Sequence, residues 1–488
     1  MKLKKTLSGS NIVPLIVVSL SVLVLLLIPL KIISYGYIPT DDAMRHVAKA
    51  ISGLDWDKIL VIREDIKMDS HPGWHAILTA VHKAANLPAD DLMVFSIASL
   101  FLIFCLVPIF FMERPESWIA ALLAVSIASR EFVYRLTLGR PYIFTMSTVL
   151  IFAFLWPRLR NKKIDWPGVI LLTASIAVST WVHGLWYMFA LPIACLFAAR
   201  EWRSGIIFGA SAISGVLIGA SLTGHPLMFL GQILNHGIHS FNNHAVTRML
   251  VGEFQPSDGA PLMVLLVLAM LAWRAIRNSW NIKTIDNPVF FLGLAGWVAG
   301  LAVWRFWLDW GMPAICVWMA LEFQDFFKKT IDRYSWRRVS ILFFSGLTLF
   351  LLVTSDLGGR WTNNLVNDYI SNEDPDTVPW LPESDGIVYL TDMTLFYQTF
   401  YKNPEARWRY VLGFEPTWMK PDDLAIFRNI EWNQGAFKSF EEWVKKMRSQ
   451  DRLMVRYTSE KPPAISGLEW HYAATNIWIG RLPKKISK

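Results

Sequence analysis

The sequence predicts a polytopic α-helical membrane protein that ends in a small soluble α/β domain. Of its 488 residues, 53% are hydrophobic and only 18% are charged, whereas globular chains carry about 25% charged residues. Apolar runs long enough to cross a bilayer recur over residues 1–355. In residues 356–488 these runs are absent, and Gly, Asp, Asn and Pro punctuate the chain. We therefore predict a transmembrane domain over 1–355 and a soluble domain over 356–488.

About eleven apolar segments are predicted to span the membrane. They are residues 12–34, 92–112, 117–129, 141–157, 167–182, 184–199, 205–223, 260–276, 288–305, 311–325 and 338–355. The first segment follows MKLKK, so a cleaved signal peptide is the alternative. Its apolar run is too long for a signal core, and no small-x-small cleavage motif precedes Tyr35. A retained span is the preferred interpretation.

The charges of the loops predict the orientation. Alternate loops are short and mostly basic: MKLKK, MERPES, RLRNKK, AREWRS, WRAIRNSWNIK and KKTIDRYSWRR. Basic loops stay in the cytoplasm, so the N-terminus is predicted to lie on the cytoplasmic side. The predicted location of the protein is the inner (cytoplasmic) membrane. The opposite loops, 36–91, 130–140, 224–259 and 306–310, and the C-terminal domain would be periplasmic in a bacterium. The net charge of +8 then reflects topology, and nucleic acid is not an expected partner.

In the C-terminal domain, GIVYL (386–390) and RLMVRY (452–457) are predicted strands. SFEEWVKKMRSQ (439–450) is a predicted helix with a capping box between Ser439 and Glu442.

The first outer loop, 36–91, is too long for a simple connection. In YIPTDDAMRHVAKAI, Thr40 can cap a helix with Asp41 and Asp42 in its first turn. An apolar stripe follows at helical spacing, which predicts an amphipathic helix on the membrane surface: Met44, Val47, Ala48 and Ile51. A second such helix would be capped by Ser70 and carry Pro72, Trp74, Ile77, Leu78 and Val81.

The acidic pair has two interpretations. Acidic residues stabilise a helix N-terminus, and Asp41 can pair with Arg45 four residues later. Alternatively, a carboxylate at the outer lipid boundary can act as a general base between a lipid-borne substrate and a water-borne acceptor.

PTDDAMR after the first span, together with the predicted topology, resembles the GT-C superfamily of glycosyltransferases. Protein O-mannosyltransferases and aminoarabinose transferases share this plan. The C-terminal domain has no WWD-type oligosaccharyltransferase signature, and Asp-Asp departs from the Asp-Glu or single Asp typical of these families. The resemblance implies inverting transfer of a sugar from a polyprenyl phosphate or diphosphate to a hydroxyl of a lipid, glycan or protein. Asp41 would be the base, and Asp42 would orient it or bind a metal.

Arginines on the outer side are candidates for binding the phosphate, because a guanidinium matches phosphate geometry. Arg135 and Arg140, with Arg130 nearby, lie in SREFVYRLTLGRPY (129–142), and Arg305 precedes Asp309 in WRFWLDWGMP (304–313). Arg45, beside the acidic pair, is a further candidate. The alternative is that these side chains contact lipid headgroups.

The histidines leave open whether the protein binds a divalent cation (Mg²⁺, Mn²⁺ or Zn²⁺). His71 and His75 have the i, i+4 spacing of a metal pair, and helical arithmetic places His82 on the same face. Other candidates lie in later segments: His183, His236, His239, His244 and Asp309. The alternative is that they line a polar cavity.

Three tryptophans of the C-terminal domain could stack on sugars or form its core, which is preferred for most of them: Trp408, Trp418 and Trp432.

Other functions remain open. An O-antigen ligase or polymerase also has many spans, but usually places its key residues in later loops. A transporter usually shows charged spans or repeated halves, and neither is evident here. A structural scaffold is the remaining alternative.

Overall fold

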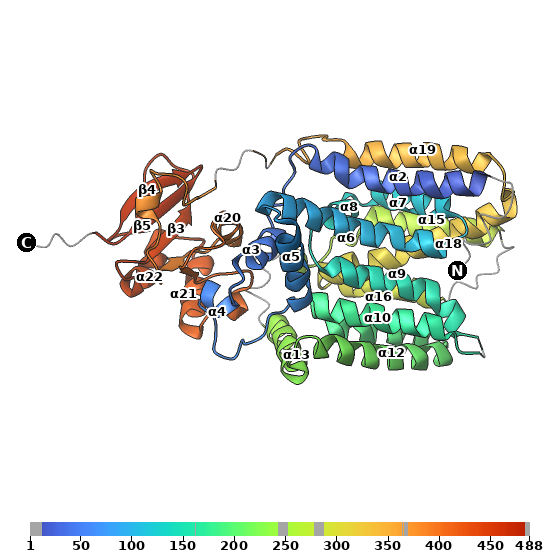
Figure 1. Cartoon of the computed structure of the whole chain (residues 1–488), viewed down its shortest axis with the longest axis horizontal. Coiled ribbons are helices and arrows are strands. Elements are labelled where there is room, and N and C mark those ends of the chain that lie inside the picture. Colours follow the sequence, from blue (N-terminus) through green and yellow to red (C-terminus); the bar gives the residue numbers. More distant parts are fainter. Residues whose placement is uncertain are drawn as a thin grey trace, which may run out of the picture. The chain divides into compact units, whose positions relative to one another are not determined.

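The computed structural model describes residues 12–161, 163–242, 252–277, 287–363, 365 and 369–483. The described chain forms two compact units (Figure 1). The helical unit comprises the described parts of Met1–Tyr37, Phe95–Leu227 and Val251–Thr362. The mixed unit comprises those of Ile38–Val94, Met228–Leu250 and Asn363–Lys488.

Every predicted span coincides with helical structure. Among the described residues, six helices are long and apolar enough to cross a membrane: α2 (Val13–Ile33), α6 (Ala89–Phe111), α9 (Tyr142–Leu159), α10 (Trp166–His183), α12 (Trp202–Ser221) and α19 (Arg337–Thr354). The other predicted spans are α7 (Pro115–Ala128), η1 with α11 (Trp186–Phe189, Ala190–Ala198), α15 (Pro261–Arg277), α16 (Pro288–Gly300) and α18 (Met312–Thr330). The chain is therefore multi-pass in character, and the total of eleven spans remains a prediction.

Within the helical unit, predicted inner loops contact one another, and predicted outer loops do the same. The predicted inner loops meet where Arg114 donates to the Ile331 carbonyl and where Arg203 donates to that of Asn161. Two predicted outer loops, 130–140 and 224–259, meet where Arg140 pairs with Glu253. The alternation of loops therefore holds in these contacts, while the side of the membrane that each set faces remains a prediction.

Small residues allow α10 and α12 to pack closely (Figure 1). A Cβ on Gly219 would lie 2.3 Å from the Ala177 carbonyl oxygen, and one on Gly215 would lie 2.7 Å from that of Thr173. Glycines four residues apart let helix backbones approach where no hydrophobic effect drives association in lipid.

Gly219→Ala is expected to destabilise the protein by about 1–3 kcal/mol, because the added methyl must push the two helices apart. Gly209 lies on the same helix, and a Cβ added there would meet no atom within 4 Å. Gly209→Ala is therefore the matched control and should cost no stability. Thermal unfolding of both variants in detergent checks this expectation, and equal losses would contradict it.

The mixed unit contains a five-stranded sheet in the order β2-β1-β3-β5-β4. Its strands are β1 (Ile387–Tyr389), β2 (Arg409–Tyr410), β3 (Arg452–Arg456), β4 (Glu469–Ala474) and β5 (Ile477–Arg481). β1 is parallel to β2 and to β3, whereas β5 is antiparallel to β3 and β4. Both strands predicted from sequence, β1 and β3, are confirmed.

The helices and short 3₁₀ turns of the mixed unit complete its α/β fold. They are α3 (Asp42–Ser52), α4 (Trp56–Ile59), α5 (Pro72–Ala85), α13 (Pro226–Asn242), η5 (Val378–Trp380), α20 (Met393–Lys402), η6 (Pro416–Trp418), α21 (Pro421–Trp432), η7 (Phe437–Phe440) and α22 (Glu441–Lys446). The predicted helix 439–450 is shorter, and it has no capping box because Ser439 lies inside η7 and the cap of α22 makes no side-chain bond.

The first outer loop belongs with the C-terminal residues, which corrects the predicted boundary between 1–355 and 356–488. Leu60 forms a parallel bridge with Tyr410, and Ile62 forms an antiparallel bridge with Met419. α3 packs against α5 and α20. Backbone pairing to β2 therefore ties this loop to the sheet.

The same packing corrects the prediction that α3 lies with its apolar stripe on the membrane surface. Met44, Val47 and Ala48 are fully buried within the protein. The caps also differ from prediction: Asp41 replaces Thr40 at α3, and His71 replaces Ser70 at α5.

Candidate functional site

The predicted catalytic carboxylates lie at the start of α3. Asp41 is the N-cap residue, in extended backbone conformation, and its Oδ1 accepts a hydrogen bond of 2.7 Å from the Asp42 N–H. Asp42 is the first helical residue and holds Arg45 with both oxygens, at 2.5 Å from Nε and 3.1 Å from Nη2. The expected pairing of Asp41 with Arg45 is therefore wrong, because Arg45 pairs with Asp42, three residues before it. The two aspartates have distinct contacts.

Arg45 is a buried cation. Its side chain is 3% exposed, and its guanidinium carbon lies 3.8 Å from the centre of the Phe414 ring, a cation–π arrangement. Burial opposes its charge, but the ion pair with Asp42 more than offsets this and raises the pKa of Arg45. Its Nη1 makes no hydrogen bond to any described residue. Arg45 is thus a fixed positive charge beside the Asp42 carboxylate.

A chain of hydrogen bonds lies behind α3. Asp69 contacts His75 Nδ1, and His75 Nε2 lies 2.8 Å from Nδ1 of His46. Asp69 also accepts from the indole of Trp56 (3.2 Å) and from the His71 N–H (3.0 Å). His46 and His75 are both buried. The sequence prediction included His71 and His75 but missed His46, which lies in the same turn of α3 as Asp42.

The protonation of this chain follows from burial. Burial lowers the pKa of both His71 and His75, so both are neutral at pH 7. Burial alone would raise the pKa of Asp69, but His75 and the His71 N–H hold it well below its usual range. An ionised Asp69 fixes the proton of His75 on Nδ1, leaving Nε2 to accept from His46. The chain therefore holds His46 in one orientation beside the carboxylates.

Asp69→Asn is expected to lower the stability of the protein at pH 7. The difference in stability between wild type and variant should become smaller as the pH falls. A carboxyl whose folded-state pKa is depressed stabilises the fold above its unfolded pKa of about 3.9, and that contribution is lost as pH falls toward the folded value. Thermal unfolding of wild type and variant from pH 7 to pH 3 measures the difference. A difference that stays constant over this range would contradict the assigned charge.

Three other predicted histidines, His82, His236 and His183, have partners outside this chain. His82 Nδ1 donates to the Leu87 carbonyl at 2.8 Å. His236 contacts Glu415 at 2.6 Å, and His183 lies 2.9 Å from Thr145 Oγ1. The His239 side chain and His244 lie outside the described residues.

No three His, Cys, Asp or Glu side chains of the described residues are arranged to hold a metal ion.

In the helical unit, three predicted phosphate-binding arginines come together around two carboxylates. Arg135, on α8 (Arg130–Leu136), lies 2.7 Å from Asp309 and 2.5 Å from Glu253. Arg140 lies 2.6 Å from Glu253, and Arg305 lies 3.2 Å from Asp309. Three guanidiniums and two carboxylates leave this arginine cluster with a net positive charge.

Local structure positions the arginine cluster. Asp309 lies in η4 (Trp307–Gly311), a π-helical turn that follows α17 (Trp304–Phe306), and such turns are frequent at functional sites. Glu253 lies in the short turn η2 (Gly252–Phe254), and burial would raise its pKa, but Arg135 and Arg140 hold it well below the usual range. Sequence reasoning missed Glu253, because one Glu in a long loop carries no periodic signal.

Two tryptophans of the C-terminal domain are core residues, as preferred: Trp408 and Trp418 are buried. Trp432 is exposed, so two of the three tryptophans are core residues, in line with the expectation for most of them.

No family model matches the chain, and no curated protein matches it significantly.

Proposed function

We propose that the protein is a membrane glycosyltransferase of GT-C type that takes a sugar from a polyprenyl-phosphate or polyprenyl-diphosphate carrier. It transfers the sugar to a hydroxyl of an acceptor lipid, glycan or protein, on the periplasmic face of the inner membrane. The observation that carries the proposal is the arginine cluster, in which Arg135, Arg140 and Arg305 gather in outer loops of a chain with membrane-length helices. The acidic pair at the start of α3 supplies a second element.

The arginine cluster suits a leaving phosphate. In the proposed reaction, the bond between the anomeric carbon and the phosphate oxygen breaks, and negative charge develops on the leaving group. Guanidiniums held in place by carboxylates stabilise such charge without reorganising. Arg140, with a side chain 16% exposed, and Arg305, 26% exposed, are the members accessible to a ligand. Arg135 is buried and supports them.

The acidic pair suits removal of the acceptor proton. The acceptor hydroxyl attacks the anomeric carbon as a carboxylate takes its proton, so inversion needs no covalent intermediate. Asp42 is committed to Arg45 by two hydrogen bonds. This ion pair supports a positioning role for Asp42, and we assign the base to Asp41. No step of this reaction requires a metal, and a divalent cation remains outside the proposal.

Binding of polyprenyl phosphate tests the phosphate site. Arg140→Gln is expected to weaken binding of undecaprenyl phosphate to the purified full-length protein by about 10–100-fold, because a hydrogen bond to a charged group contributes about 1.5–3 kcal/mol. Glu253→Gln should tighten binding, because it removes the carboxylate that competes with phosphate for Arg135 and Arg140.

Arg160→Gln makes the same change of charge at an exposed arginine that pairs with Glu201 in predicted inner loops, and it is the matched control. Native mass spectrometry or a filter assay gives the dissociation constants of wild type and of the three variants. Equal weakening by Arg140→Gln and Arg160→Gln would reject the arginine cluster as the phosphate site.

A further inference from the structure

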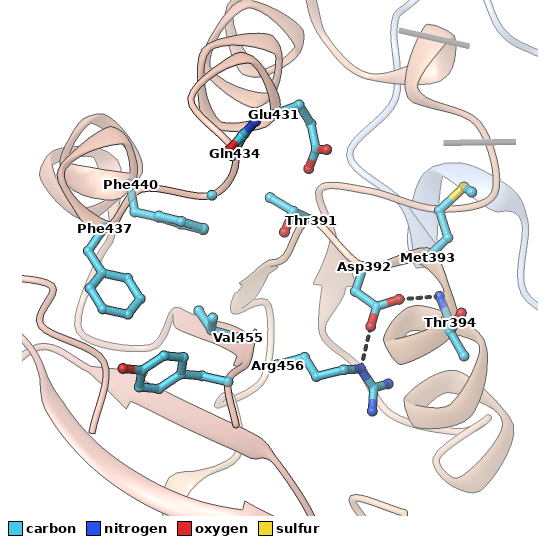
Figure 2. Close-up of a pocket in the computed structure, with 12 residues that line it drawn as sticks. Thr391, Asp392, Met393, Thr394, Glu431, Gln434, Phe437, Phe440, Val455 and Arg456 are labelled. Atoms are coloured by element: carbon cyan, nitrogen blue, oxygen red, sulfur yellow. Dashed lines mark hydrogen bonds and ion pairs between the residues drawn. The ribbon is translucent and has the colours of Figure 1, made fainter. Parts of the chain in front are cut away.

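The mixed unit holds a cavity of about 580 Å³ that the proposed chemistry does not use. It opens beyond the carboxyl ends of two parallel strands, β1 and β3 (Figure 2). Thr391 and Asp392 come shortly after the end of β1. Arg456 is the last residue of β3, and Tyr457 follows it. The remaining wall comes from the end of α21 and from η7.

The topology of the sheet makes this a favoured place for a ligand. From β1 the chain passes through α20 to β2 on one side of β1, and then through α21 and α22 to β3 on the other side. The order of strands therefore reverses at β1. In open α/β sheets, ligands bind outside the carboxyl ends of the strands at such a switch point.

The walls of the cavity combine aromatic and polar groups. The Phe437 and Tyr457 rings meet edge to face, with centres 5.0 Å apart. Phe440 also lines the cavity and lies near Phe437 in Figure 2. In Figure 2, Glu431 and Gln434 lie above the aromatic side chains, with Gln434 next to Phe440, and Thr391 lies near the centre of the view. A lining that combines aromatic rings with hydroxyl, amide and carboxyl groups matches a sugar ring, which has apolar C–H faces and a rim of hydroxyls.

The charges of the cavity exclude anions. Arg456 is its one lining cation among the described residues, and it is paired with Asp392 at 2.7 Å. Glu431 is a second lining carboxyl, so the charged side chains sum to about one negative charge. A phosphate or carboxylate group would therefore be repelled, whereas a neutral or basic sugar would not.

We propose that this cavity, the sugar cavity, binds a neutral or basic hexose unit that carries no phosphate or carboxylate. If the proposed function holds, this hexose unit belongs to the acceptor glycan. Only the link to the acceptor rests on the proposed function, whereas sugar binding is argued from the cavity itself. Phe437 and Tyr457 would contact a C–H face, and Glu431 and Gln434 would accept from and donate to the hydroxyls. An amino group on the sugar would pair with Glu431.

Saturation-transfer NMR on the full-length protein, in a detergent without a sugar headgroup, tests the proposal with glucose, galactose, mannose, glucosamine and glucose 6-phosphate. A neutral hexose or glucosamine should bind, and glucose 6-phosphate should not. Phe437→Ala should weaken binding at least about 10-fold, as expected when about 1.4 kcal/mol of ring contact is lost.

Matched variants separate contact from folding. Trp432→Ala removes an exposed aromatic residue next to Glu431 but outside the cavity lining, and should leave binding unchanged. Glu431→Gln should remove any preference for glucosamine over glucose while glucose still binds. The proposal is overturned if none of the uncharged or basic sugars binds, if glucose 6-phosphate binds best, or if Phe437→Ala and Trp432→Ala behave alike.

The sugar test needs no lipid donor. Loss of undecaprenyl phosphate binding in Arg140→Gln and loss of hexose binding in Phe437→Ala are therefore separate readouts. Phe437→Ala should leave undecaprenyl phosphate binding intact. Hexose binding without any binding of polyprenyl phosphate would reject the transferase proposal and keep the sugar cavity.

Discussion

Asp41→Asn is expected to lower the rate of sugar transfer by about 10²–10⁴-fold, the range that a positioned general base contributes. Asn cannot accept the proton of the acceptor hydroxyl, yet it caps helices as well as Asp does. The variant therefore removes the proposed chemistry while it keeps the contact that Asp41 makes to the Asp42 N–H. Release of polyprenyl phosphate from a lipid-linked sugar extract of host membranes, measured by liquid chromatography with mass spectrometry, follows the reaction.

Asp165→Asn is the matched control, because Asp165 caps α10 by accepting from the Gly168 N–H. It should fold and act like wild type. Asp41→Ala removes both cap and base, and should lose about 1 kcal/mol of stability in addition to activity. If Asp41→Asn retained full activity, Asp41 would be a cap alone, and the base would have to be sought elsewhere.

Arg338→Ala is expected to destabilise the protein by about 3–5 kcal/mol, the usual cost of leaving a buried charge unpaired. Arg338 at the start of α19 holds Glu116 of α7 with two hydrogen bonds, of 2.6 and 3.0 Å. Both side chains are almost completely buried, at 2% and 0% exposure. Thermal unfolding in detergent, followed by tryptophan fluorescence, measures the loss.

A double variant distinguishes the cost of leaving one buried charge unpaired from the cost of lost packing. Because a buried ion pair replaced by apolar residues of similar volume is often neutral in stability, Arg338→Met with Glu116→Leu should recover much of the stability that Arg338→Ala loses. Lys445→Ala is the surface control, because Lys445 and Glu442 form an exposed pair, and it should change little. A double variant no more stable than Arg338→Ala would show that packing, rather than the unpaired charge, dominates.

The sequence predicted the helices well because hydropathy and length are local properties. Each predicted span coincides with helical structure, and β1 and β3 were recognised from short apolar runs between turn residues. The surroundings of α3 could not be predicted in this way. Its periodicity showed that one face is covered, but whether lipid or protein covers it depends on Leu60 pairing with Tyr410, 350 positions further along the chain.

The candidate site was predicted in part for a similar reason. Arg135, Arg140, Arg305 and Asp309 were candidates because they lie at the predicted outer ends of spans, and the structure brings them together. Glu253 and His46 carry no such signal, since their roles depend on partners that are distant in sequence. The sugar cavity was not predicted, because its walls come from four separate segments.

The central claim is tested most directly in the host itself. The gene is deleted, envelope glycans and lipids are profiled by mass spectrometry, and wild type, Asp41→Asn or Asp165→Asn is restored at matched membrane levels. The account predicts that deletion removes a defined sugar from one acceptor, that wild type and Asp165→Asn restore it, and that Asp41→Asn does not. An unchanged profile after deletion, or full restoration by Asp41→Asn, would contradict it.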